Sequence, residues 1–133
     1  MTETTNYPTI KIARGHDRRQ KAGSPWLFSN ELKLDDAAKA LPAGSIVRLM
    51  TPTGKIVGVA HFNPHSLIAA RLLSRNKDAR IDGSFLERRL ARALALRDRL
   101  YDRPFYRLVH AEGDGLPGLV VDRYGDTVVV QYL

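Results

Sequence analysis

Three short segments rich in β-branched and other apolar residues follow one another in the middle of the chain. They are Ser45–Met50, Lys55–Phe62 and Leu67–Leu73, and the stretches Thr51–Gly54 (TPTG) and Asn63–Ser66 (NPHS) connect them. Pro, Gly, Asn and Ser in these connections are residues typical of tight turns. Strands this short and this close together bury their apolar faces by pairing into one curved sheet. We therefore expect a small closed or half-closed β-barrel that ends near Ser74.

The residues before these segments extend the same prediction. Thr9–Ala13 alternates and favours a first strand. Arg14–Ala22 is polar and basic and is followed by Gly23 and Pro25, which indicates a brief helix with a glycine end. Trp26 and Phe28 come next. They could stack on nucleic-acid bases, but their apolar setting (PWLF) favours a place in the core.

The second half of the chain has a different pattern. Arg75–Gly83 is a predicted linker, and Ser84 and Glu87 form a capping-box pattern at the start of a predicted helix from about Phe85 to Tyr101. Three strand candidates follow, Tyr106–Ala111, Leu119–Arg123 and Thr127–Leu133. The predicted fold is therefore mainly β with α+β character. A β-barrel domain over residues 1–75 precedes an incomplete α/β unit over residues 76–133, made of one helix and a β-hairpin or meander.

Charge gives the first indication of a partner. The chain has 21 Lys and Arg against 14 Asp and Glu, a net charge of +7. A surplus of this size favours a polyanion, because each neutralised phosphate releases counterions, although it also serves solubility alone. The surplus is concentrated over residues 71–107, where 11 basic residues face 5 acidic ones. The arginine-rich helix in this region could bind a polyanion or simply face solvent.

The chain lacks the residues that several classes of function need. The chain has no cysteine, which excludes disulfides and thiolate chemistry, and no apolar run approaches the roughly 20 residues that span a bilayer. The polar segment Met1–Ile10 lacks the apolar centre of a signal peptide. We expect a cytoplasmic protein without membrane contact.

Two groups of residues are candidate reactive sites. His61 and His65 are four residues apart, but Pro64 breaks the helical face that would bring them together on a metal. Glu112 and Asp114 are paired carboxylates near His110, yet the surrounding glycines and proline indicate a tight turn rather than an acid–base site. We therefore expect no catalytic, metal-binding or cofactor-binding residue in this chain.

Four stretches, taken in order, carry a family resemblance. They are Arg14–Gly23 (RGHDRRQKAG), Pro25–Glu31 (PWLFSNE), Asn63–Arg71 (NPHSLIAAR) and Glu112–Gly125 (EGDGLPGLVVDRYG). Together they resemble the start of the bacterial large-subunit 23S rRNA (cytosine-C5) methyltransferases that begin with a PUA domain, and the last stretch is the most specific.

The resemblance implies a PUA domain, the opening of a central α/β domain, and a longer parent that carries a Rossmann-like domain for S-adenosylmethionine. That family performs its chemistry with cysteines near the carboxyl end, and this chain has none. The resemblance thus implies an rRNA-processing transferase as the parent. It also implies that these 133 residues bind no cofactor and are inactive alone.

The resemblance also implies where RNA binds, because PUA domains bind RNA near their first helix and the adjoining loop. The expected RNA-binding residues, for 23S rRNA in particular, are Arg14, His16, Arg18, Arg19, Lys21, Gly23 and Arg71. The alternative is a structural module that forms a homodimer by pairing the apolar segment Thr127–Leu133 with its counterpart in a second copy.

Overall fold

The computed structural model describes residues 6–132, and these divide into two compact units, with the boundary between Arg80 and Ile81. Residues 1–5 of the polar amino-terminal segment, and Leu133 at the end of the last predicted strand, lie outside the described residues. No helix within residues 6–132 is long and apolar enough to cross a bilayer.

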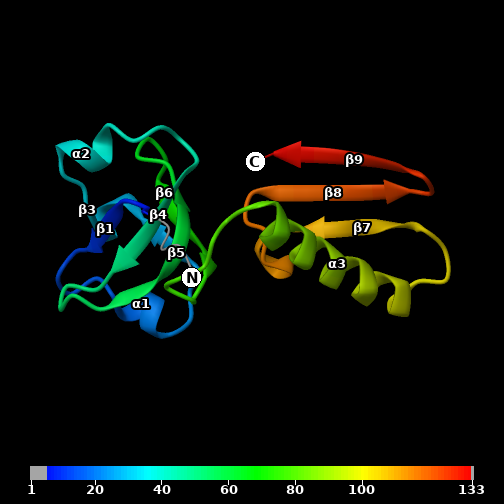
Figure 1. Cartoon of the computed structure of the whole chain (residues 1–133), viewed down its shortest axis with the longest axis horizontal. Helices are drawn as coiled ribbons and strands as arrows, with labels where there is room; N and C mark the ends of the chain where they lie inside the picture. The colour runs from blue at the N-terminus through cyan, green and yellow to red at the C-terminus, as the bar shows by residue number, and fades with distance from the viewer. Residues whose placement is uncertain (1–5, 133) are drawn as a thin grey trace. The chain divides into compact units, whose positions relative to one another are not determined.

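The first unit is built on a curled, half-barrel sheet of six strands in the order β2-β6-β5-β4-β1-β3 (Figure 1). Its strands are antiparallel neighbours except β1 and β4, which run parallel. The strands are β1 Thr9–Ile12, β2 Trp26–Phe28, β3 Leu32–Lys33, β4 Ser45–Met50, β5 Ile56–Phe62 and β6 Ile68–Ser74. The three strands predicted between residues 45 and 73 are confirmed to within one residue at each end.

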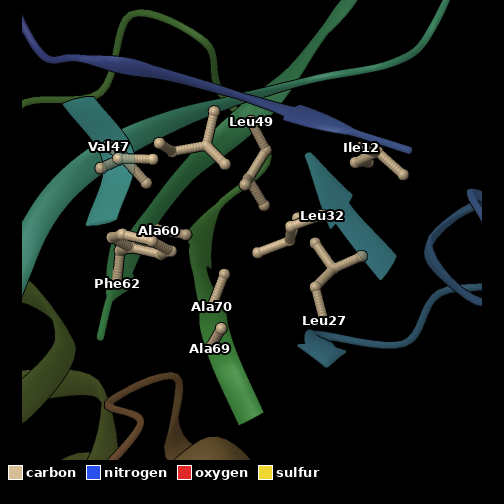
Figure 2. Packing of buried hydrophobic residues seen from close by; sticks show 11 residues of the cluster. Ile12, Leu27, Leu32, Val47, Leu49, Ala60, Phe62, Ala69 and Ala70 are labelled. Carbon is tan, nitrogen blue, oxygen red and sulfur yellow. The ribbon is translucent and has the colours of Figure 1, made fainter. Parts of the chain in front are cut away.

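One face of this sheet holds the core. Fully buried side chains from five strands meet there, among them Ile12, Leu27, Val47, Leu49 and Phe62 (Figure 2). Ala60, Ala69 and Ala70 are equally buried and let neighbouring strands pack closely around Phe62.

The prediction that Trp26 and Phe28 belong to the core is wrong. Leu27 is the residue of β2 that enters the core, at 1% exposure, and the flanking Trp26 and Phe28 are only half-buried. In a strand the two neighbours of an inward residue must point to the other face, so burial of Leu27 turns both rings away from the core.

Short helices connect the strands. They are α1 Arg18–Lys21, the 3₁₀ turn η1 Ser29–Glu31, and α2 Asp36–Lys39. The helix predicted over residues 14–22 is confirmed only from residue 18, because Gly15 adopts a left-handed backbone with φ 81° and the His16 N–H donates to the Ala13 carbonyl.

The second unit contains α3 Gly83–Leu100 and the antiparallel sheet β7-β8-β9. Its strands are β7 Phe105–His110, β8 Leu119–Tyr124 and β9 Thr127–Tyr132, with the 3₁₀ turn η2 Ala111–Asp114 after β7. The predicted helix and three strands are thus present, and the sheet is a simple meander. Ala93 of α3 packs with Val109, Leu116 and Val121 in a small core.

The predicted cap of this helix is wrong by two residues. Asp82, not Ser84, is the N-cap, and its carboxylate accepts a hydrogen bond of 3.0 Å from the Phe85 N–H. An ionised carboxylate at the first turn also interacts favourably with the helix dipole, which a serine hydroxyl does not.

Gly58 lies where β5 packs closely against β6, and a substitution there tests this packing. A Cβ at this position would overlap the Ser74 carbonyl oxygen and lie 3.0 Å from the Arg75 Cα. We expect Gly58→Ala to lower the free energy of unfolding by about 1–3 kcal/mol, measured by urea denaturation. Gly83→Ala is the control, because a Cβ there meets nothing within 4 Å. Equal stability of both variants would contradict this packing.

Candidate nucleic-acid interface

A hollow of about 380 Å³ opens in the first unit beside α1. Four parts of the chain form it, namely α1, the connection between β4 and β5, the start of β5, and the residue that follows β6. Its lining residues are Gln20, Lys21, Thr51, Lys55, Ile56, Val57 and Arg75. The hollow combines three cationic side chains, an amide and a hydroxyl with an apolar wall from β5, a composition that suits an anionic ligand with an apolar part.

Backbone pairing explains why these distant residues meet. β2 pairs antiparallel with β6, with Trp26 opposite Arg71, and the Leu72 N–H donates to the Pro25 carbonyl at 2.7 Å. The chain that precedes β2 therefore runs beside the end of β6. This pairing carries α1 to Arg75.

The charges of the hollow are only partly compensated. Lys21 pairs with Asp17 at 3.0 Å, and this hydrogen bond holds the pKa of Asp17 below its usual range. Lys55 and Arg75 are exposed and make no ion pair within residues 6–132. Thr51 fixes the turn that presents Lys55, because the Thr51 hydroxyl accepts from the Lys55 N–H at 3.0 Å. The hollow is thus net positive.

Two arginines lie against the half-buried rings of β2. The Arg19 guanidinium stacks on Phe28 at 4.5 Å from the ring centre and forms an ion pair with the buried carboxylate of Glu31. Arg71 lies over Trp26, with 5.5 Å between guanidinium and ring centre. Glu31 also accepts from the Phe28 N–H at 2.9 Å, so the pair ties α1 to η1. Arg19 therefore has a structural role in this unit.

The predicted RNA-binding residues fall into four groups. Lys21 lines the hollow, while Arg19 and Arg71 stack on aromatic rings. Arg14, His16 and Arg18 are exposed and have no ion-pair partner within the described residues. Gly23 is exposed and has a left-handed backbone with φ 102°, which fits the predicted helix end.

Sequence reasoning missed every lining residue of the hollow except Lys21, including the polar residues Gln20, Thr51, Lys55 and Arg75. Lys55 follows a turn and Arg75 follows a strand, so each looks like an ordinary solvated end when read alone. The available signal was that both stand at strand ends that a curved sheet brings to one rim.

In the second unit, Asp114 is bound into the η2 turn. The buried Asp114 carboxylate receives two hydrogen bonds from Arg97, of 2.6 and 2.9 Å, and one of 2.6 Å from the His110 N–H. Burial alone would raise the pKa of Asp114, but the Arg97 and His110 hydrogen bonds and charges outweigh burial and lower it. A carboxylate held ionised in this way fixes a turn and is poorly suited to proton transfer.

Comparison with known proteins defines the class of the first unit. Residues 10–75 match the family of PUA-like domains. The fold of most of the chain also occurs in a protein from Streptococcus mutans assigned provisionally as a SAM-dependent methyltransferase. That structure aligns with 94% of this chain and 33% of its own, with a TM-score of 0.75 and 19% identity.

Comparison with curated proteins identifies a more specific relationship than the fold does. The chain is homologous to ribosomal RNA large subunit methyltransferase I, at 38% identity to the Aliivibrio fischeri protein over 94% of this chain and at 35% identity to the Salmonella arizonae protein over 100% of it. These matches cover 32% and 34% of the relatives, so the chain spans about a third of their length. The PUA-like domain and the relationship to rRNA large-subunit methyltransferases, both expected from the four stretches, are confirmed.

Asp114 makes the stability of the second unit dependent on pH. Because its pKa is lower in the folded state, the Asp114–Arg97 pair contributes fully above the unfolded pKa of about 3.9 and is lost as pH falls below it. We expect Asp114→Asn to lower stability by about 1–3 kcal/mol at pH 7 and to flatten the acid limb. Thermal unfolding from pH 7 to pH 2 measures both. An acid limb identical to that of the wild type would contradict the assignment.

Proposed function

We propose that this chain is the RNA-binding amino-terminal part of a SAM-dependent 23S rRNA (cytosine-C5) methyltransferase, acting in the cytoplasm. The observation that carries the proposal is the positive hollow beside α1, formed by Lys21, Lys55 and Arg75 in the PUA-like unit. The names of the relatives, all rRNA large-subunit methyltransferases, support RNA as the polyanion.

Different residues of the hollow can supply affinity for phosphates and selectivity for a base. Lys55 and Arg75 are free to neutralise phosphates, which position a nucleic acid without reading its sequence. The Gln20 amide offers a donor and an acceptor, the two functions needed to recognise the edge of a base. Arg14, Arg18 and the backbone near Gly23 extend the contact along α1. Arg19 acts through Glu31, as a positioning residue.

The described residues do not fit the methyl donor. Binding of S-adenosylmethionine in Rossmann-like domains relies on a glycine-rich turn between a parallel strand and a helix. The sheet of the second unit is antiparallel, and α3 of that unit precedes its first strand rather than following one. We assign the cofactor and the methyl transfer to the remainder of a full-length protein. We also regard the second unit as the opening of its central domain.

Loss of the two free cations tests the proposal. We expect Lys55→Gln/Arg75→Gln to bind a labelled 23S rRNA fragment roughly 5- to 30-fold more weakly at low salt. The slope of log affinity against log salt should fall by roughly 1.4 to 1.8 for two lost phosphate contacts. Fluorescence anisotropy across a salt series measures both.

The matched control is Lys39→Gln/Arg103→Gln, which removes the same charge from exposed positions outside the hollow. A loss of affinity equal in the two double variants would mean that net charge alone attracts RNA. The site would then be wrongly placed.

A second candidate function has its own observation. β9 is an edge strand, and its side chains Val128, Val129, Val130 and Tyr132 are 51%, 49%, 45% and 86% exposed. An exposed apolar edge of this kind pairs readily with another strand, so a homodimer through β9 is the alternative.

Sedimentation velocity at several protein concentrations tests the dimer. If β9 pairs between copies, the wild type should dimerise and Val129→Lys should remain a monomer, because an edge lysine opposes strand addition. The control is Asp126→Lys, which adds a lysine outside β9 at an exposed position. A wild-type monomer at all concentrations would eliminate this candidate.

A further inference from the structure

A second hollow, of about 410 Å³, lies entirely within the second unit, between α3 and the η2 turn. Arg92 and Arg99 line it from α3, Ala95 and Leu96 lie between them on that helix, and Gly113 and Asp114 come from the turn. Its volume lies in the range of roughly 300–1,000 Å³ that is usual for ligand sites. The proposed function makes no use of it.

The charge of this hollow is positive despite the carboxylate in its wall. Asp114 is held by Arg97 through two hydrogen bonds of 2.6 and 2.9 Å, so its charge is already compensated. Arg92 and Arg99 are exposed and form no ion pair within residues 6–132. The lining therefore includes two guanidinium groups that are available to an anion.

Neighbouring arginines reinforce the positive potential. The Arg89 guanidinium donates to the Gly115 carbonyl at 2.6 Å, which anchors it beside the hollow. Burial, and then the charges of Arg92 and Arg88, lower the pKa of Arg89. Like charges this close repel one another, and an anion bound among them would relieve the repulsion.

The spacing of the two arginines and the apolar residues between them favour one class of anion. Arg92 and Arg99 are seven residues apart on one face of α3, so their Cα atoms are separated by about 10 Å along the helix. Between them Ala95 leaves room and Leu96 is 46% exposed. Two cations at this separation, with an apolar surface between them, suit an extended chain of phosphates and bases better than a single inorganic ion.

We propose that this hollow is a second RNA contact, with Arg92 and Arg99 each holding a backbone phosphate and the nucleoside between them lying over Ala95 and Leu96. The planar guanidinium fork pairs with phosphate through two hydrogen bonds, which favours arginine at such positions. The exposed apolar surface of Ala95 and Leu96 suits the face of an unstacked base, so the expected ligand is single-stranded or looped RNA rather than a duplex. The proposal rests on the proposed function only in that RNA is the ligand.

Fluorescence anisotropy with a labelled oligouridine tests the proposal on the full chain. We expect Arg92→Gln/Arg99→Gln to bind roughly 5- to 30-fold more weakly than the wild type. The charge-matched control Lys39→Gln/Arg103→Gln should lose clearly less. Arg92→Lys/Arg99→Lys should fall between the wild type and the Gln variant, because lysine keeps the charge and loses the fork. Far-UV circular dichroism confirms that each variant is folded.

The outcomes separate this proposal from the previous one. Weaker binding in Lys55→Gln/Arg75→Gln but not in Arg92→Gln/Arg99→Gln would overturn the second contact and leave the first intact. The reverse result would support the second contact alone. A titration with uridine monophosphate distinguishes a free nucleotide from RNA. Binding of the monophosphate that depends on Arg92 and Arg99, with unchanged oligouridine affinity, would overturn RNA as the ligand.

Discussion

The pairing of β2 with β6 is the interaction on which the candidate site depends. β2 has only three residues, and it is held by backbone hydrogen bonds, by the fully buried Leu27 and by the two arginine–ring stacks. A strand this short is marginal alone and gains its stability from burial. Its place on the sheet fixes the path of the preceding segment, and that path brings Lys21 to Arg75. The site therefore depends on the pairing of β2 with β6 at this edge of the sheet.

The arginines of this protein divide into those that build the fold and those that remain free. Arg19 and Arg97 each satisfy a buried carboxylate, Glu31 and Asp114 respectively. Removal of either would leave an uncompensated buried charge, which is strongly destabilising. Arg75, Arg92 and Arg99 compensate no buried carboxylate within the described residues. Only the arginines that pair with no buried carboxylate can bind a ligand without loss of stability. The net charge of +7 therefore overstates the charge that is available for binding.

The sequence predicted the positions of strands well, but it did not predict which side chains contact one another. Alternation and turn residues located β4, β5 and β6 to within one residue, because these signals are local. The role of Arg19 was not predictable, since Glu31 stands 12 residues away and nothing local distinguishes Arg19 from Arg18. Lys55 and Arg75 were missed for the same reason. A short PWLF run could not show which of its residues faces inward until the pairing of β2 was known.

Two positive hollows on two linked units have a thermodynamic consequence. If one RNA occupies both, the second contact forms within the complex, at an effective concentration set by the connecting segment rather than by the solution. Modest contacts can then combine into firm binding, and no single arginine need dominate. Such an arrangement would favour a long RNA over a short oligonucleotide that reaches only one unit. It would also make the loss caused by either pair of substitutions larger on the long RNA, where it removes the gain from linkage as well as the contact itself.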